Sequence, residues 1–195
     1  MKPIAPSDSA TLPRVAGLLL AAGGGRRLGG RPKALLEYAG RPLVEHALRA
    51  LREAGCGPVH IVLGAAADEV RERADLEGCV LVDNPDWAGG MGASLRAGLR
   101  SLADTEVRRA GTGAQAVVVA LVDQPGIGSG AVARVIHAYQ GPSSLAAASY
   151  GGRRGHPVLF GAEPLGGGGG AGGRRSGRPR LPETSPGGGL PRRMR

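Results

Sequence analysis

Aromatic side chains are scarce in this chain, which has one tryptophan, three tyrosines and one phenylalanine among 195 residues. A core of ordinary size must therefore be built from Leu, Val, Ile and Ala. The same scarcity counts against binding of single-stranded nucleic acid, because that binding depends on bases stacking on aromatic rings. We therefore expect an aliphatic core, and nucleic acid is disfavoured as a partner.

The chain also has only two cysteines and no long apolar run. Cys56 and Cys79 lack the CxxC spacing of redox and zinc motifs, and no Cys/His pattern suggests a zinc site. A membrane-spanning helix needs about 18 or more apolar residues in a row, and no signal-peptide core precedes the first strand. These absences predict reduced cysteines, no membrane partner and a cytoplasmic location.

Positive charge is unevenly distributed, although the net charge of +9 resembles that of nucleic-acid-binding proteins. Residues 162–195 are dominated by Gly, Pro and Arg and hold seven arginines against two glutamates. Such a segment cannot bury enough apolar surface to offset chain entropy. We expect a disordered leader at 1–13, a folded domain at 14–161 and a disordered tail at 162–195. The tail is a basic interaction segment, a segment without function, or an out-of-frame end of a GC-rich gene.

Short aliphatic runs, by contrast, are abundant and alternate with helical patterns. Strand patterns occupy residues 15–21, 58–63, 79–82 and 116–122. The first is continuously apolar, which is typical of a buried parallel strand. Helical patterns are centred on residues 42–54, 68–75, 94–102 and 129–139, and further strands on 145–149 and 157–160. The alternation predicts an α/β domain of three layers with a mostly parallel sheet. Asp68 is a candidate helix cap, and we expect the strand at 157–160 to lie antiparallel at an edge.

The first strand leads directly into a glycine-rich, basic segment, and residues 15–33 read VAGLLLAAGGGRRLGGRPK. Glycines let the main chain approach a ligand closely, and unpaired N–H groups in such a turn bind anions. Arg26, Arg27 and Lys33 add positive charge. The segment predicts a phosphate-binding loop, although it matches neither the dinucleotide fingerprint nor the P-loop. No acidic residue directly follows the strand at 58–63, which disfavours a nicotinamide cofactor.

Other polar residues follow the ends of predicted strands, at the edge of the sheet where ligands bind. Asp123 is either a ligand of Mg²⁺, which prefers carboxylates plus phosphate oxygens, or a helix cap. Ser94 is either a cap or an anion ligand at a helix N-terminus, and His156 suits a structural role or a substrate contact equally. No Ser/His/Asp or Cys/His nucleophile set is present in the sequence. Its absence favours chemistry by positioning and charge, as in nucleotidyl transfer.

Four motifs, in order, resemble those of the MobA-like nucleotidyltransferases, and most of all the molybdenum cofactor cytidylyltransferase branch. The start of the domain, LLLAAGGGRRLGG followed by Lys33, is similar to the family signature LAAGxSxRMGxxK. Further along, NPDWAGGMGASL, LVDQP and GHPVLF are similar to NPxWxxGMxxSL, LxDQP and GHPVLF. The resemblance covers about residues 14–161 and implies a Rossmann-like nucleotidyltransferase fold.

The resemblance also implies an activity and a set of site residues. A nucleoside monophosphate would move from a triphosphate to a phosphorylated pterin cofactor, with release of pyrophosphate; Ala21-Ala22-Gly23 favours CTP. The implied catalytic residues are Arg27 and Lys33 on the phosphates and Asp123 on a bridging Mg²⁺. The implied nucleotide-binding residues are Leu20, Ala21, Ala22, Gly23, Gly24, Gly25, Lys33 and Asn84, and the acceptor-binding ones are Gly90, Met91, Ser94 and His156. The resemblance also implies a protein partner, a molybdoenzyme or its chaperone.

The sequence departs from the family after residue 161, where the family continues with further helices and a late acidic segment. Glu163 and Glu183 are the only acidic residues in 162–195, so a second carboxylate near the metal is missing from the expected site. Two alternatives therefore stay open. One is a degraded, inactive relative that only binds nucleotide, and the other is a family member acting on a sugar phosphate or phospholactate.

Overall fold

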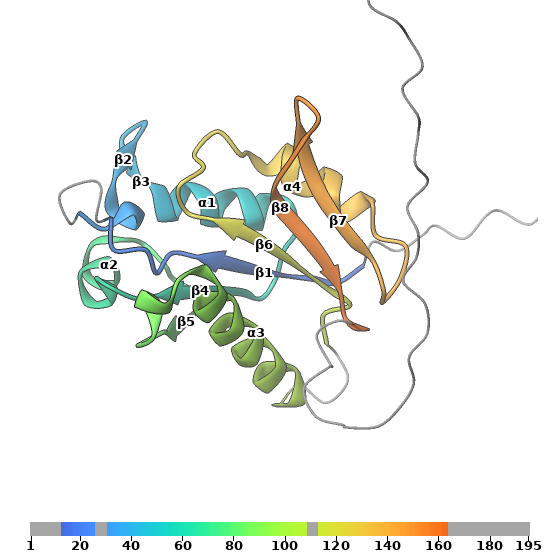
Figure 1. Ribbon diagram of the computed structural model, residues 1–195, viewed down its shortest axis with the longest axis horizontal. Coiled ribbons are helices and arrows are strands. Elements are labelled where there is room, and N and C mark those ends of the chain that lie inside the picture. The colour runs from blue at the N-terminus through green and yellow to red at the C-terminus, as the bar shows by residue number, and fades with distance from the viewer. Residues whose placement is uncertain (1–12, 26–30, 109–112, 164–195) are drawn as a thin grey trace, which may run out of the picture.

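The folded part of the chain is a single α/β unit (Figure 1). The computed structural model describes residues 13–25, 31–108 and 113–163. The predicted leader and tail lie almost wholly outside these ranges, and so does Arg27. None of the helices within them has the length and apolar character that crossing a bilayer requires.

A six-stranded sheet forms the centre of the fold, in the order β5-β4-β1-β6-β8-β7. Its strands are β1 (Val15–Leu20), β4 (Val59–Leu63), β5 (Val80–Asp83), β6 (Ala116–Leu121), β7 (Leu145–Tyr150) and β8 (Arg153–Gly161). The first four run parallel, whereas β8 is antiparallel to both β6 and β7. A separate ribbon pairs β2 (Glu37–Tyr38) with β3 (Arg41–Pro42).

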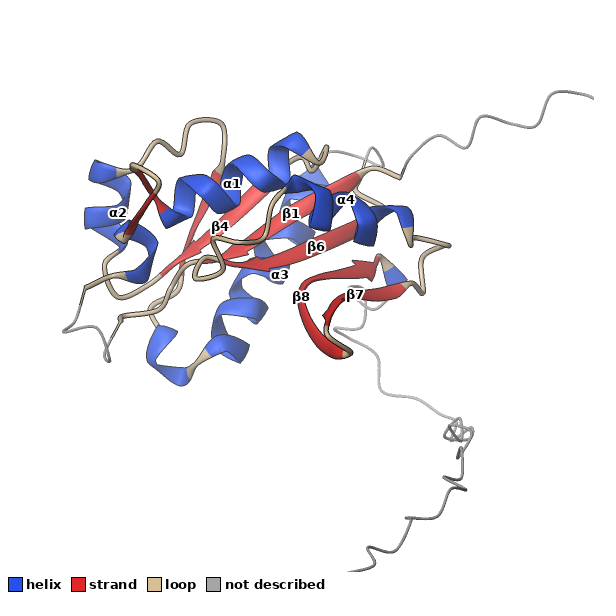
Figure 2. Cartoon of the chain, turned by 90° about the horizontal axis from the view of Figure 1, so that it is seen from above, coloured by secondary structure: helices blue, strands red, loops and turns tan. Residues whose placement is uncertain are grey.

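Helices cover both faces of the sheet, which confirms the predicted three-layer α/β class. They are α1 (Leu43–Glu53), α2 (Ala67–Arg73), α3 (Met91–Arg108) and α4 (Ser129–His137), with short 3-10 turns η2 (Lys33–Leu35) and η3 (Trp87–Gly89). Helices α1 and α4 lie on one face and α3 on the other (Figures 1 and 2). Because β1 is covered on both sides, all six of its residues are buried.

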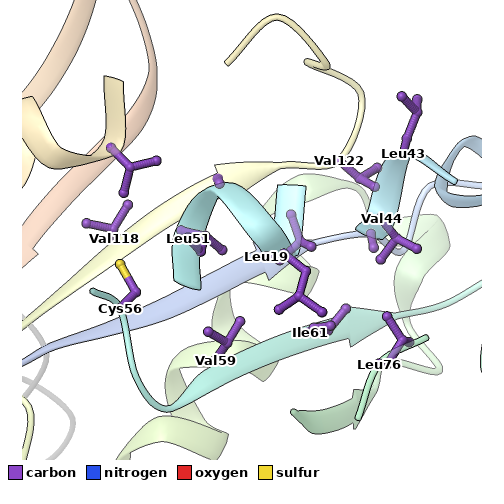
Figure 3. Close-up of a cluster of buried hydrophobic side chains, with 14 of the residues drawn as sticks. Leu19, Leu43, Val44, Leu51, Cys56, Val59, Ile61, Leu76, Val118 and Val122 are labelled. Atoms are coloured by element: carbon purple, nitrogen blue, oxygen red, sulfur yellow. The ribbon is translucent and has the colours of Figure 1, made fainter. Parts of the chain in front are cut away.

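The core is aliphatic, as predicted, and none of the described aromatic side chains is among the buried ones. On the α1 side, Leu19, Leu51 and Ile61 form the centre of a cluster that also holds Cys56 (Figure 3). On the α3 side, Leu18 and Val62 pack in a second, smaller cluster. Alternate residues of the central strands thus supply both layers.

Three expectations on local structure are wrong. Strand β8 is antiparallel, as expected, but it lies between β6 and β7, so β7 is the edge; the tight turn at Gly151-Gly152, both with positive φ, returns the chain inside it. Helix α3 begins at Met91, because the turn at Gly90 (φ 90°) starts it early, and Ser94 therefore lies inside its first turn. Helix α2 has Ala66 at its N-cap without a side-chain cap, and Asp68 falls in its first turn.

The folded region also extends slightly beyond the predicted boundary at residue 161. The N–H of Ala162 donates to the carbonyl of Gln115 at 3.0 Å, and that of Glu163 to the carbonyl of Pro142 at 2.9 Å. These bonds attach the chain to the domain as far as Glu163.

Candidate functional site

A cleft of about 230 Å³ opens at the carboxyl ends of β1 and β6, facing the start of α3. This is the edge at which parallel α/β sheets bind ligands, because the strand-to-helix loops converge there. The cleft is lined by Leu20, Ala22, Gly23, Lys33, Trp87, Gly90, Met91, Ser94, Leu121, Val122 and Asp123. Most of the site residues predicted from three separate motifs therefore line a single cleft.

Lys33 and Asp123 form an ion pair in this cleft, with 2.7 Å between Nζ and Oδ2. Lys33 begins η2, and Asp123 follows β6; the two are neighbours because β6 pairs with β1 in register. Their side chains are 36% and 40% exposed, so solvent screening limits what the pair adds to stability. Its significance is chemical, since it places an ammonium group and a carboxylate side by side in the wall of the cleft.

The first glycine-rich loop leaves β1 in a shape that its glycines require. Gly25 has a φ of 58°, and a Cβ there would overlap the carbonyl oxygen of Arg31. Gly25 and Arg31 therefore lie close together. The backbone N–H of Ala21 already has a partner, because it donates to the carbonyl of Val62 at 2.9 Å. Its predicted contact with the nucleotide would have to come from other atoms.

Asn84 does not line the cleft but anchors its second loop. Its side-chain amide donates to Ser94 Oγ at 3.0 Å, and its Oδ1 accepts from the N–H of Asp86 at 3.1 Å. Asn84 and Ser94 are each only 5% exposed. Any effect of Asn84 on a nucleotide would therefore pass through the residues it holds in place.

His156 lies near Asp123 but outside the cleft. Strand β8 runs antiparallel to β6, so its first residues reach the edge at which β6 ends. Burial lowers the pKa of His156 below its ordinary value of 6.5, and the charge of Asp123 partly opposes that shift. Its imidazole is therefore neutral at pH 7, and the free energy of unfolding falls as the pH drops below about 6.5 and the unfolded chain gains a proton first.

We expect the Asp123→Asn variant to lower the pKa of His156 further, because the neighbouring negative charge is removed. The measurement is an NMR titration of the imidazole carbon-bound protons, assigned with a His156→Gln variant. An unchanged pKa in Asp123→Asn would show that the two groups do not interact, and a raised pKa would contradict the expected sign of their interaction.

Three residues of the cleft wall escaped the sequence-based prediction: Trp87, Leu121 and Val122. Trp87 lies inside the NPDW motif, and its place in that motif was the sequence signal that could have identified it as a cleft residue. Leu121 and Val122 end the strand that precedes Asp123, and their apolar character alone gave no sign of a role. Arg27 lies outside the described residues, so its place in the site stays a prediction.

Comparison with known proteins gives a consistent result. A family model described as MobA-like NTP transferase domain matches residues 17–179. The nicotine blue oxidoreductase of Paenarthrobacter nicotinovorans is 44% identical over 158 residues, covering 77% of this chain and 72% of that protein. The molybdenum cofactor guanylyltransferase of Pseudomonas aeruginosa strain LESB58 is 38% identical over 94 residues, 47% of this chain and 44% of that protein.

Solved structures extend the similarity to three dimensions. A Mycobacterium sp. strain JC1 homologue of Rv0371c is 34% identical with a TM-score of 0.63, and the match covers 78% of this chain and 72% of that one. Rv0371c of Mycobacterium tuberculosis H37Rv, in a crystal structure with manganese, is 28% identical with a TM-score of 0.61 over 78% of this chain and 73% of that one.

Proposed function

The chain belongs to the MobA-like NTP transferase family, and from that premise we propose that it transfers CMP from CTP to a phosphate of a phosphorylated pterin cofactor, releasing pyrophosphate. The observation that carries this proposal is the Lys33–Asp123 pair at 2.7 Å in a cleft between the glycine-rich loop and the start of α3. Such a cleft offers backbone and cationic groups to the triphosphate on one side and room for an acceptor on the other.

In the proposed reaction, an oxygen of the acceptor phosphate attacks the α-phosphorus of the nucleotide. A new P–O bond forms there as the bond to the bridging oxygen of pyrophosphate breaks, so no oxidant or reductant is needed. The protein contributes by alignment and charge rather than by a covalent intermediate. We assign the phosphates to the Gly23–Gly25 loop and Lys33, and the acceptor to the side formed by Gly90, Met91 and Ser94. His156, which lies outside the cleft near Asp123, is the further residue proposed to contact the acceptor.

Asp123 is the residue that would hold Mg²⁺. Within the described residues, no three His, Cys, Asp or Glu side chains are grouped as a metal site. One carboxylate still suits this ion, because Mg²⁺ retains waters and takes its other ligands from nucleotide phosphates. When bound, the ion would supply positive charge to the phosphate oxygens. The manganese-bound crystal structure of the mycobacterial relative supports a divalent cation in the family's fold.

The test is an assay of pyrophosphate release from CTP, GTP, ATP and UTP, each with Mg²⁺ and molybdopterin cofactor, followed by mass analysis of the product. We expect release with CTP and a product heavier by one CMP. Preference for GTP would instead align the chain with the guanylyltransferase relative. The chain would be an inactive relative if it bound nucleotide but released no pyrophosphate with any acceptor, whether the pterin, a sugar phosphate or phospholactate.

The similarity to nicotine blue oxidoreductase favours a second candidate, reduction of a heteroaromatic compound, because that alignment covers most of both chains. Against it, β4 is followed by Gly64, Ala65 and Ala66, so no carboxylate stands where a nicotinamide nucleotide's ribose is commonly held. The two candidates separate in one experiment. Oxidation of a reduced nicotinamide nucleotide on adding nicotine blue, without pyrophosphate release from any triphosphate, would replace the transferase proposal.

The Lys33→Gln variant should bind CTP about tenfold or more weakly, because a hydrogen bond to a charged group contributes roughly 1.5–3 kcal/mol. Equilibrium titration calorimetry measures the change directly. Arg49→Gln is the matched control. Arg49 pairs with Glu53 on α1, away from the cleft, so its replacement removes one positive charge at a distance from the site. Equal losses in the two variants would reduce the role of Lys33 to general electrostatics.

A further inference from the structure

Trp87, the only tryptophan of the chain, touches glycines on two other elements while lining the cleft. A Cβ built on Gly24 would stand 3.1 Å from its Cζ3 and 3.2 Å from its Cη2. A Cβ built on Gly64 would stand 2.7 Å from the Trp87 Cβ. The outer edge of the indole therefore lies against the first glycine-rich loop, and its base lies against the end of β4.

Gly64 marks a point where three backbones meet. Besides the Trp87 Cβ, a side chain at Gly64 would meet the carbonyl oxygen of Ala22 at 2.6 Å and the Cβ of Ala22 at 2.8 Å. The end of β4, the loop after β1 and η3 are thus packed without space for one methyl group. Such close packing transmits small displacements, because the neighbours have no room to absorb them.

The position of Trp87 is also fixed by hydrogen bonds to its own segment. Its N–H donates to the carbonyl of Asn84 at 3.2 Å, and the N–H of Asn84 donates to the carbonyl of Leu63 at 2.9 Å. The Asn84 side chain adds the bonds to Asp86 and Ser94. The segment that carries the indole is therefore bonded both to the end of β4 and to the first turn of α3.

We propose that Trp87 is a positioning residue for the nucleotide: mounted through Asn84, its indole supports Gly24 and holds the Gly23–Gly25 loop in the shape that receives the phosphates. The inference rests on the proposed function, since it takes that loop to be the nucleotide site. It assigns to Trp87 a role in the shape of the loop and, together with the close contacts of Ala65 and Ala22, accounts for the lack of side chains at Gly24 and Gly64.

The test compares Trp87→Phe with Leu99→Ala by equilibrium binding of CTP. Phenylalanine keeps the contact at Gly64 but lacks the ring atoms that reach Gly24, so we expect the Kd to rise about tenfold while kcat at saturating CTP changes little. Leu99 packs against the same apolar cluster without lining the cleft. Its truncation should lower stability at least as much and leave the Kd unchanged.

A double-mutant cycle gives the second readout. Gly24→Ala crowds the indole and the Cβ of Ala65, which a new Cβ would meet at 3.0 Å, and in Trp87→Phe only the Ala65 contact remains. We therefore expect the losses of CTP affinity in the two single variants to be less than additive when combined. Saturable change of tryptophan fluorescence on CTP addition, which reports Trp87 alone, should accompany binding.

The outcomes separate the inference from the proposed function. Wild-type binding of CTP with an unchanged Kd in Trp87→Phe, or with strictly additive losses in the cycle, would overturn the positioning role alone. Failure of the wild type to bind any nucleoside triphosphate would overturn both.

Discussion

Replacing Asp123 by Asn is expected to lower pyrophosphate release at least about 100-fold, the scale on which single groups that stabilise developing charge contribute to catalysis. Asparagine keeps the shape of the side chain but removes the negative charge that pairs with Lys33 at 2.7 Å and that would hold Mg²⁺. The side chain is 40% exposed, so the fold should survive the change. Steady-state release of pyrophosphate at saturating CTP and acceptor is the measurement.

Asp68→Asn is the matched control for this variant. Its carboxylate is 96% exposed and pairs only with Arg71 at 3.3 Å among the described ion pairs, so the same chemical change occurs away from the cleft. We expect full activity and unchanged thermal stability. Retained activity in Asp123→Asn would remove this residue from the catalytic machinery.

Gly98→Ala should lower the free energy of unfolding by about 1–3 kcal/mol, the usual cost of overpacking a core. Gly98 lies where α3 rests on the sheet, and a Cβ there would overlap Leu18 Cδ1 and stand 3.0 Å from Val62 Cγ2. Leu18 is 0% exposed and cannot move aside into solvent. The loss should appear even though alanine is a better helix former than glycine by about 1 kcal/mol. Urea denaturation measures it.

Gly92→Ala is the comparison on the same helix. A Cβ at Gly92 would meet only Arg96 Nη1 within ordinary contact, at 3.5 Å. The helix propensity is then unopposed, and stability should rise by up to about 1 kcal/mol. If both variants changed stability in the same direction, packing of α3 at Gly98 would not be the deciding effect.

The layers of the fold were predictable because its central strands are buried on both faces. A strand such as β1, with six buried residues, has to be apolar throughout, and such a run is visible in the sequence. The place of β8 in the sheet was not predictable, because an edge strand and an inner antiparallel strand can have the same hydrophobic pattern. The start of α3 depended on the backbone conformation at Gly90, which residue type permits but does not dictate.

The cleft was predictable to the extent that its residues follow strand ends. Lys33 and Asp123 are far apart in sequence, but loops after neighbouring parallel strands meet at one edge, so a common site followed from the topology. The arrangement around Trp87 was hidden, because it depends on how closely three backbones approach one another. Glycines in the sequence show that space is needed, not which side chain fills it.

The ion pair between Lys33 and Asp123 bears on the order in which the proposed substrates load. While the ammonium group lies 2.7 Å from the carboxylate, a lone divalent cation has to compete with a tethered positive charge for the same oxygen. A triphosphate arriving with its cation offers a new partner to each member of the pair, so the exchange costs less. Under the proposed function, we therefore expect the cleft to admit the metal–nucleotide complex as one unit more readily than the free ion.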